Sequence, residues 1–181
     1  AYLNRTPSSA GNQKTFTYSV WVKRTNLGAA NYLLGAGPSG SSYATIAILS
    51  TGAIFFQNNT SGGNQISATS TALLRDPSSW YHIVLAVDTT QATNTNGVKA
   101  YVNGAQRALT FSTYNQNTDT LISSTESQLI GDYANGGGQY LDGYLAEVNF
   151  IDGSALDPTS FGELDDNNVW QPKDTSSLTF G

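Results

Sequence analysis

The strongest constraint on the fold is the strict alternation of side chains in the segment TFTYSVWVKR (residues 15–24). One parity carries aromatic and β-branched residues: Phe16, Tyr18, Val20 and Val22. A period of two places successive residues on opposite faces of a strand, and these residue types favour the extended conformation. The segment therefore predicts a β-strand with one buried face.

Further short extended segments follow, separated by turns rich in Gly, Asn and Ser. They are residues 31–36, 42–49, 53–58, 65–74, 80–88, 127–133 and 143–151. Within residues 97–109, Asn103-Gly104 tolerates the positive φ angles of a type I′ turn and predicts a hairpin.

The only helical signal is ALDPTSFGEL (155–164), where Asp157 can cap and Pro158 can take the first helical position. The crossover helices that a parallel sheet needs are missing. We therefore expect an all-β fold, an antiparallel two-sheet sandwich or jelly roll with one short C-terminal helical turn.

Composition excludes several classes of function. The net charge is −5 and no Lys/Arg cluster occurs, which argues against nucleic-acid binding through phosphates. No apolar run reaches the roughly 18 residues of a spanning helix, so we expect no membrane insertion. The absence of cysteine removes disulfides, thiol catalysis and zinc–thiolate sites.

The length of 181 residues suits one domain. The chain begins at Ala1 with AYLNRT, which reads as the tail of a strand, and ends in SSLTFG without a following turn. We expect residues 1–181 to be a single domain excised from a longer chain, although N-terminal processing explains the first residue equally well.

Three motifs occur in order: WYHIVLAVD (80–88), VKAYVNG (98–104) and IGDYANGGGQYLDGYLAEVNFIDGSALDP (130–158). Together they resemble the LamG-like jelly-roll domains of the concanavalin A-like lectin/glucanase superfamily. The variant with WVKR (21–24), residues 142–163 and VWQP (169–172) resembles domains of phage and marine-virus structural proteins. The resemblance implies a concanavalin A-like jelly roll at an extracellular or virion surface. It leaves function open, because this fold hosts lectins, hydrolases, adhesion modules and spacers.

Two loops carry the residue types that bind sugars. Aromatic faces cover the apolar side of a pyranose, and amide or carboxylate groups bind paired hydroxyls. The glycine-rich loop 132–140 supplies Asp132, Tyr133, Asn135 and Tyr140, and the loop TYNQNTDT (113–120) supplies Tyr114 and Asn117. We predict that these six residues bind a ligand. The alternative for 132–140 is a flexible hairpin loop whose tyrosines cover the sheet edge, and for 113–120 it is a solvated loop.

Several members of the superfamily bind calcium on such loops, so the resemblance implies a Ca²⁺ site with Asp119 and Asp132 as candidate ligands. Calcium takes six to eight oxygen ligands, and the acidic residues here are scattered along the sequence. Calcium is therefore a possible cofactor, with solvated loops as the alternative.

The stretch GYLAEVNFIDG (143–153) imitates the Glu-x-Asp-x-x-Glu strand of laminarinase-type glycoside hydrolases, with Glu147, Asn149 and Asp152. Retaining glycosidases need two carboxyl groups about 5–5.5 Å apart. Strand alternation predicts that Glu147 and Asn149 share a face, but Asn149 cannot ionise. Asp152 belongs to an Asp-Gly turn pair. We therefore expect no catalytic residue and no enzyme.

The sole histidine, His82, lies on an apolar strand, and no nucleophile-elbow sequence occurs, so we expect a packed or edge residue and no catalytic role. Trp170, in the polar segment VWQPKD, is a candidate for pinning the C-terminal tail against the domain. The leading hypothesis is a carbohydrate-binding or adhesion module of a surface or virion protein (of the phage tail or fibre type), with a glycan or host-surface polysaccharide as partner. The alternatives are a structural virion domain contacting other virion subunits, and a glycoside hydrolase acting on β-glucans.

Overall fold

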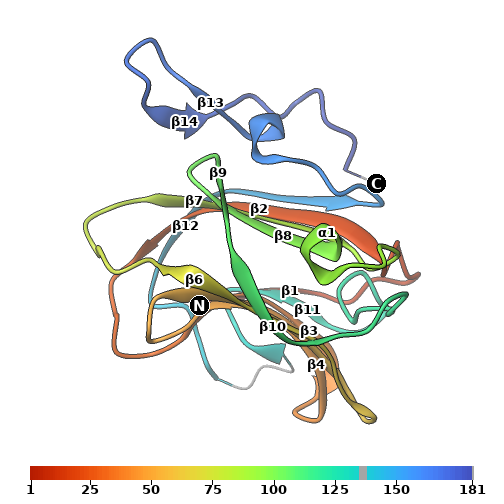
Figure 1. Ribbon diagram of the computed structural model, residues 1–181. Coiled ribbons are helices and arrows are strands. Elements are labelled where there is room, and N and C mark those ends of the chain that lie inside the picture. The colour runs from red at the N-terminus through yellow and green to blue at the C-terminus, as the bar shows by residue number, and fades with distance from the viewer. Residues whose placement is uncertain (135–137, 181) are drawn as a thin grey trace.

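The computed structural model describes residues 1–134 and 138–180 and contains two antiparallel sheets packed face to face (Figure 1). The seven-stranded sheet has the order β1-β11-β3-β4-β5-β6-β10, and the five-stranded sheet has the order β12-β2-β7-β8-β9. The predicted all-β sandwich is confirmed.

The strands of the seven-stranded sheet are β1 (Leu3–Arg5), β3 (Asn31–Ser39), β4 (Ser42–Ile48), β5 (Ala53–Thr60), β6 (Gly63–Leu73), β10 (Leu109–Tyr114) and β11 (Gln128–Ile130). Those of the five-stranded sheet are β2 (Thr15–Arg24), β7 (Tyr81–Asp88), β8 (Val98–Val102), β9 (Ala105–Arg107) and β12 (Gly143–Asp152). The remaining elements are α1 (Asn94–Gly97), the 3-10 turn η2 (Pro158–Ser160) and the hairpin strands β13 (Gly162–Leu164) and β14 (Trp170–Pro172). No helix among these described elements is long and apolar enough to cross a membrane.

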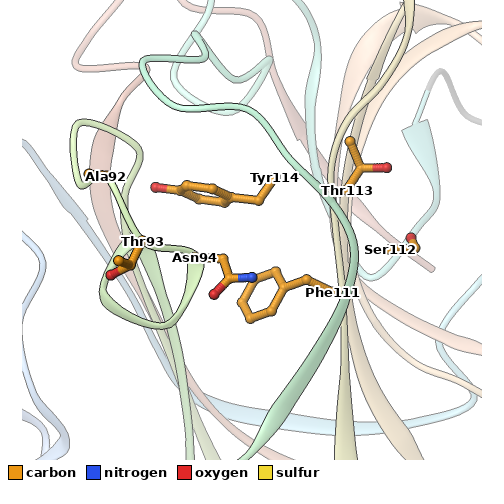
Figure 2. Close-up of a pocket in the computed structure, with 7 residues that line it drawn as sticks. All are labelled: Ala92, Thr93, Asn94, Phe111, Ser112, Thr113 and Tyr114. Carbon is orange, nitrogen blue, oxygen red and sulfur yellow. The ribbon is translucent and has the colours of Figure 1, made fainter.

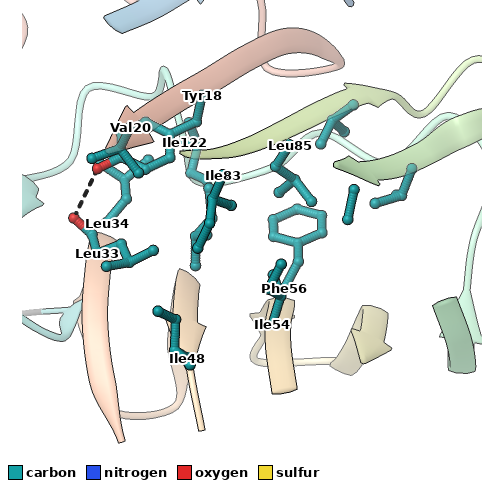
Figure 3. Close-up of a cluster of buried hydrophobic side chains, with 14 of the residues drawn as sticks. Tyr18, Val20, Leu33, Leu34, Ile48, Ile54, Phe56, Ile83, Leu85 and Ile122 are labelled. Carbon is teal, nitrogen blue, oxygen red and sulfur yellow. Dashed lines mark hydrogen bonds between the residues drawn. The ribbon is translucent and has the colours of Figure 1, made fainter. Parts of the chain in front are cut away.

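The core fills the space between the two sheets (Figure 3). The alternating residues of β2 that the sequence predicts as buried are fully inaccessible, and Ile46 and Phe56 face them from the other sheet. The Tyr18 hydroxyl donates a hydrogen bond to the Leu33 carbonyl oxygen across 3.2 Å, which satisfies the buried phenol and links β2 to β3. Burial raises the pKa of Tyr18 and keeps it neutral.

Local turn chemistry follows the sequence. Asn103 and Gly104 both have positive φ angles, 49° and 79°, as the type I′ hairpin requires. The Asp157 carboxylate accepts a hydrogen bond of 2.9 Å from the Thr159 amide and caps η2, with Pro158 inside the turn. The predicted C-terminal helical turn is thus confirmed.

A β-bulge overturns the expected alternation in β12. The pairing with β2 shifts between Ala146 and Asn149, and Glu147 has a left-handed φ of 49°. Because two residues of β12 oppose one residue of β2 here, the prediction that Glu147 and Asn149 share a face is wrong. Glu147 is exposed, whereas Asn149 is buried beneath the C-terminal segment, where it accepts a hydrogen bond from Thr175.

The C-terminal segment, from η2 to residue 180, lies over the outer face of the five-stranded sheet (Figure 1). Its anchor is Trp170, whose indole N–H donates to Nδ1 of His82 across 2.9 Å. Trp21 stacks on the His82 ring, with ring centroids 5.0 Å apart. His82 is therefore a packed residue, as predicted, and Trp170 does pin the tail.

Candidate functional site

Three tyrosine rings gather on the outer face of the seven-stranded sheet, and we call them the tyrosine cluster: Tyr32 (β3), Tyr43 (β4) and Tyr133 (the loop after β11). The Tyr133 ring lies 5.0 Å from that of Tyr32 in an edge-on contact and 5.1 Å from that of Tyr43 in a tilted contact. Tyr43 alternates with the core residues Ala44 and Ile46, which places its side chain on the face away from the core. All three rings are partly exposed, so each still offers a surface to a ligand.

A row of polar side chains extends from the tyrosine cluster across the neighbouring strands. The Tyr43 hydroxyl donates to Oε1 of Gln57 on β5 across 2.7 Å, and Nε2 of Gln57 donates to Oδ1 of Asn64 on β6 across 2.7 Å. Asn59 pairs with both Tyr43 and Asn64 in the strand register, and its Oδ1 is buried without a hydrogen-bond partner. Planar amides beside aromatic rings are the groups that bind sugar hydroxyls and pyranose faces.

The loop that carries Tyr133 is seated on β3 through Gly35. A Cβ atom at Gly35 would lie 2.7 Å from both the Ala134 nitrogen and the Asp132 carbonyl oxygen. Glycine therefore lets the loop backbone lie directly on the strand. Asp132 is fully buried: its Oδ1 accepts a 2.8 Å hydrogen bond from the Tyr133 amide, and its Oδ2 has no partner. The Asp132 carboxylate thus orients the start of the loop.

Burial, followed by the neighbouring tyrosines, raises the pKa of the Tyr133 phenol, and burial likewise raises that of Tyr32. Both phenols stay neutral at physiological pH and act as hydrogen-bond donors and acceptors rather than as charges.

The other residues predicted for this loop lie elsewhere. Tyr140 is 47% exposed and stacks on Tyr2, with centroids 5.9 Å apart, instead of joining the tyrosine cluster. Asn135 lies outside the described residues. The structure thus brings Asp132 and Tyr133 together and places Tyr140 at the N-terminal edge of the sheet.

Tyr114 lines a separate depression, which we call the edge cleft, between α1 and the edge strand β10 (Figure 2). The cleft has a volume of about 400 Å³ and is lined by Ala92, Thr93, Asn94, Phe111, Ser112, Thr113 and Tyr114. The Tyr114 hydroxyl donates to the Gln91 carbonyl oxygen across 2.7 Å, and its ring lies over Gly97.

The remaining two predicted residues do not join either site. Asn117 is exposed with a left-handed φ of 61°, and its amide donates to the Thr89 carbonyl oxygen, so it forms a turn. Asp119 makes an exposed ion pair of 3.8 Å with Lys14, just before β2 begins. The loop containing Asp132 closes at the other end of β2, where the Thr25 amide donates to the Asp142 carbonyl oxygen.

The two residues predicted as calcium ligands, Asp119 and Asp132, lie near opposite ends of β2. The described residues contain no group of three or more acidic or histidine side chains able to hold a metal ion. The free Oδ2 of Asp132 is a single candidate ligand, whereas calcium requires six to eight oxygens.

The stretch GYLAEVNFIDG, which imitates an acid/base strand, offers no carboxyl pair among its described residues. Asp152 is held at the N-terminal segment, where its Oδ1 accepts from the Asn12 amide across 2.7 Å and from Ser123 across 3.4 Å. The Asn149 amide donates to the Glu147 carbonyl oxygen. These side chains fix loops in place, and the described geometry gives no support to the glycoside-hydrolase hypothesis.

A larger cavity of about 520 Å³ opens between β1 and β12, at the edge of the sandwich where both sheets end. Leu34, Ile122 and Phe150 contribute core-type apolar surface to it. Its polar side chains Gln128 and Asp152 already hydrogen-bond to other residues. The described lining of this cavity contains no tyrosine ring, unlike the two other places.

Comparisons with known proteins identify the family of this fold. A family model described as the concanavalin A-like lectin/glucanases superfamily matches residues 2–160. No curated protein sequence matches the chain significantly.

Solved structures share the fold at low sequence identity. The CBM40 of the Ruminococcus gnavus IT-sialidase is 18% identical, with a TM-score of 0.60 over 87% of this chain and 95% of that one. Domain 4 of the Geobacillus stearothermophilus arabinanase AbnA, in complex with arabinotriose, is 17% identical, with a TM-score of 0.57 over 82% and 65%. The native heptameric SAP-like pentraxin of Limulus polyphemus is 16% identical, with a TM-score of 0.58 over 86% and 70%.

Proposed function

Because this chain belongs to the concanavalin A-like lectin/glucanases superfamily, we propose that it is a non-catalytic carbohydrate-binding module whose binding surface is the tyrosine cluster and its amide row. The CBM40 of the Ruminococcus gnavus IT-sialidase has been solved bound to α2,3 sialyllactose and to α2,6 sialyllactose. AbnA domain 4 has been solved with arabinotriose. These ligands belong to those proteins; they support a carbohydrate as the class of ligand here.

The observation that carries the proposal is the placement of Tyr133 between Tyr32 and Tyr43, next to the amide of Gln57. A pyranose ring stacks its apolar face on such rings, while the amide row binds its hydroxyls. The half-buried side chain of Asn59, which pairs with Tyr43 in the strand register, extends the amide row beside these rings.

Each such site binds weakly because it is open and contributes few contacts, so useful adhesion requires several copies. This agrees with a module displayed repeatedly on a surface. The resemblance of residues 21–24, 142–163 and 169–172 to phage and marine-virus structural domains supports a virion tail or fibre as that surface.

A glycan array tests the proposal with the labelled full chain, in the presence and absence of calcium. We expect binding to a defined set of glycans, with the signal lowered by Gln57→Ala and retained in Tyr144→Ala, which removes an exposed tyrosine of the other sheet. A folded wild-type chain that binds no glycan in either buffer overturns the proposal.

Calcium is a separate prediction that rests on the free Oδ2 of Asp132. If calcium binds there, adding it shifts the amide resonance of Tyr133, which is hydrogen-bonded to the same carboxylate. The Asp132→Asn variant removes that shift. Spectra that are identical with calcium and with a chelator remove calcium from the proposal.

A second candidate function is a structural domain that contacts neighbouring subunits. Large apolar side chains favour it: Tyr144 on the edge strand β12 is 60% exposed, and Leu164 and Val169 at the β13–β14 hairpin are 59% and 57% exposed. Exposed apolar groups of this kind mark protein contacts. A stable oligomer in sedimentation equilibrium, weakened by Leu164→Ser, supports this function, and a monomer at all concentrations opposes it.

A further inference from the structure

The edge cleft owes its shape to a β-bulge in β10. The register with β6 shifts between Phe111 and Thr113, so Phe111 pairs with Ala68 and Tyr114 pairs with Ile66. In a regular strand, residues three apart point to opposite faces. The bulge instead directs both Phe111 and Tyr114 toward α1, with their rings 6.1 Å apart and nearly perpendicular (Figure 2).

An amide faces the pair of rings from the opposite wall. Asn94, the first residue of α1, extends its side chain toward Phe111 (Figure 2). Within the part of the chain that the structure describes, the Asn94 carboxamide has no hydrogen-bond partner, so its donors and its acceptor are available to a ligand. The Thr93 side chain adds a hydroxyl to the same wall.

The walls of the edge cleft carry no charge. None of its seven lining residues is acidic or basic. The carboxylate of Asp88 acts on Tyr114, since it follows burial as a cause of the raised pKa of that phenol. An anionic sugar would find no cation there and would meet this negative charge. The volume of about 400 Å³ lies within the range of small-molecule sites.

We propose that the edge cleft between α1 and β10 is a second carbohydrate-binding site, selective for a neutral sugar ring that stacks on Phe111 and Tyr114 and pairs two hydroxyls with the Asn94 amide. It lies at the β10 edge of the seven-stranded sheet, whereas the tyrosine cluster lies over β3 and β4. This inference takes only the class of ligand, a carbohydrate, from the proposed function. Two sites on one domain allow it to engage two points of a polysaccharide, which raises avidity within a single copy.

Amide chemical shifts of the ¹⁵N-labelled full chain test this site separately from the tyrosine cluster. The probes are D-glucose, D-galactose, L-arabinose and N-acetyl-D-glucosamine, each titrated to millimolar concentration, with N-acetylneuraminic acid as the anionic contrast. We expect at least one neutral sugar to shift the resonances of residues 92–94 and 111–114, and N-acetylneuraminic acid to leave them unchanged.

Two matched variants assign the effect. Asn94→Ala lowers the affinity at the edge cleft at least about fivefold, because two hydrogen bonds to the sugar are lost. Asn96→Ala removes an exposed amide from the same turn and leaves the affinity unchanged. Both side chains are partly or fully exposed, so neither variant is expected to unfold the chain.

The outcomes separate the two proposals. Shifts at Tyr43 and Gln57 without shifts at residues 92–94 overturn the second site and leave the proposed function standing. Shifts at the edge cleft alone support the second site and overturn the placement of the main site. If Asn94→Ala binds as the wild type does, or if only N-acetylneuraminic acid binds, the second site is overturned.

Discussion

Trp170 donates its indole hydrogen bond to Nδ1 of His82, 2.9 Å away, and this bond helps to join the C-terminal segment to the outer face of the five-stranded sheet. On the opposite side of the imidazole ring, Nε2 lies 2.9 Å from the Ser19 hydroxyl. Because Nδ1 must accept, the proton of the neutral ring is on Nε2 and donates to Ser19. His82 is 1% exposed and its ring is stacked on Trp21.

Folding stability is therefore expected to fall in mild acid. Burial lowers the pKa of His82 from 6.5 to about 4. Between these values the unfolded chain binds a proton that the folded chain does not, so stability is complete above pH 6.5 and declines as the pH falls toward 4. The pKa difference corresponds to about 3 kcal/mol, measured as the free energy of unfolding by urea titration at several pH values.

The His82→Gln variant is the control for this pH dependence. Glutamine keeps an oxygen acceptor for Trp170 but does not titrate, so its unfolding free energy stays level between pH 6.5 and 4. Hydrogen bonds with Ser78 and Ser79 lower the pKa of the Asp76 carboxyl to about 2. Asp76 therefore changes the folding stability mainly below this pH window. An equal pH slope in wild type and variant contradicts the role assigned to His82.

The packing of the Trp170 ring against Gly162 is expected not to tolerate a larger residue at position 162. A Cβ atom at Gly162 would lie 2.5 Å from the Trp170 ring, so Gly162→Ala displaces the indole and costs about 1–3 kcal/mol of stability. Faster hydrogen exchange over residues 162–172 reports the loosened segment. Gly40→Ala, with no atom within 4 Å of the new methyl group, is the matched control and changes stability by less than about 0.5 kcal/mol.

The loop that carries Tyr133 depends on Gly35 in the same way. In Gly35→Ala the new methyl group meets the backbone of Asp132 and Ala134 at 2.7 Å, which cannot yield as a flexible side chain does. We expect a loss of about 1–3 kcal/mol in stability and weaker glycan binding, since the loop moves off the sheet. A crystal structure of the variant with Tyr133 still between Tyr32 and Tyr43 contradicts this account.

The sequence predicts the sandwich well because its signals are local. The period-two pattern of residues 15–24, the Asn103-Gly104 turn and the Asp157 cap each depend on neighbours in the chain, and each is confirmed. The strand β10, the short helix α1 and the β13–β14 hairpin were not predicted. These elements are short, and tertiary contacts such as that of Trp170 with His82 help to stabilise them.

The candidate sites were predicted only in part. Tyr133 belongs to the tyrosine cluster, Asp132 orients its loop and Tyr114 lines the edge cleft, but Tyr32, Tyr43 and Asn94 were missed. The alternation in SYATIAIL places Tyr43 opposite the core face, yet only strand order and register bring it to Tyr133. Likewise, the bulges in β10 and β12 change the face of the sheet to which the following side chains point. A prediction based on regular alternation does not include such a change.

The most direct test of the account is isothermal titration calorimetry with the best-bound glycan of the array, comparing wild type, Tyr43→Ala and Tyr144→Ala. Tyr43 contributes a ring and a hydroxyl to the tyrosine cluster, whereas Tyr144 is an exposed tyrosine on β12. We predict that Tyr43→Ala weakens binding about tenfold or more, which is 1.4 kcal/mol or more, and that Tyr144→Ala binds as the wild type does. Unchanged affinity in a folded Tyr43→Ala variant, or an equal loss in Tyr144→Ala, contradicts the central claim.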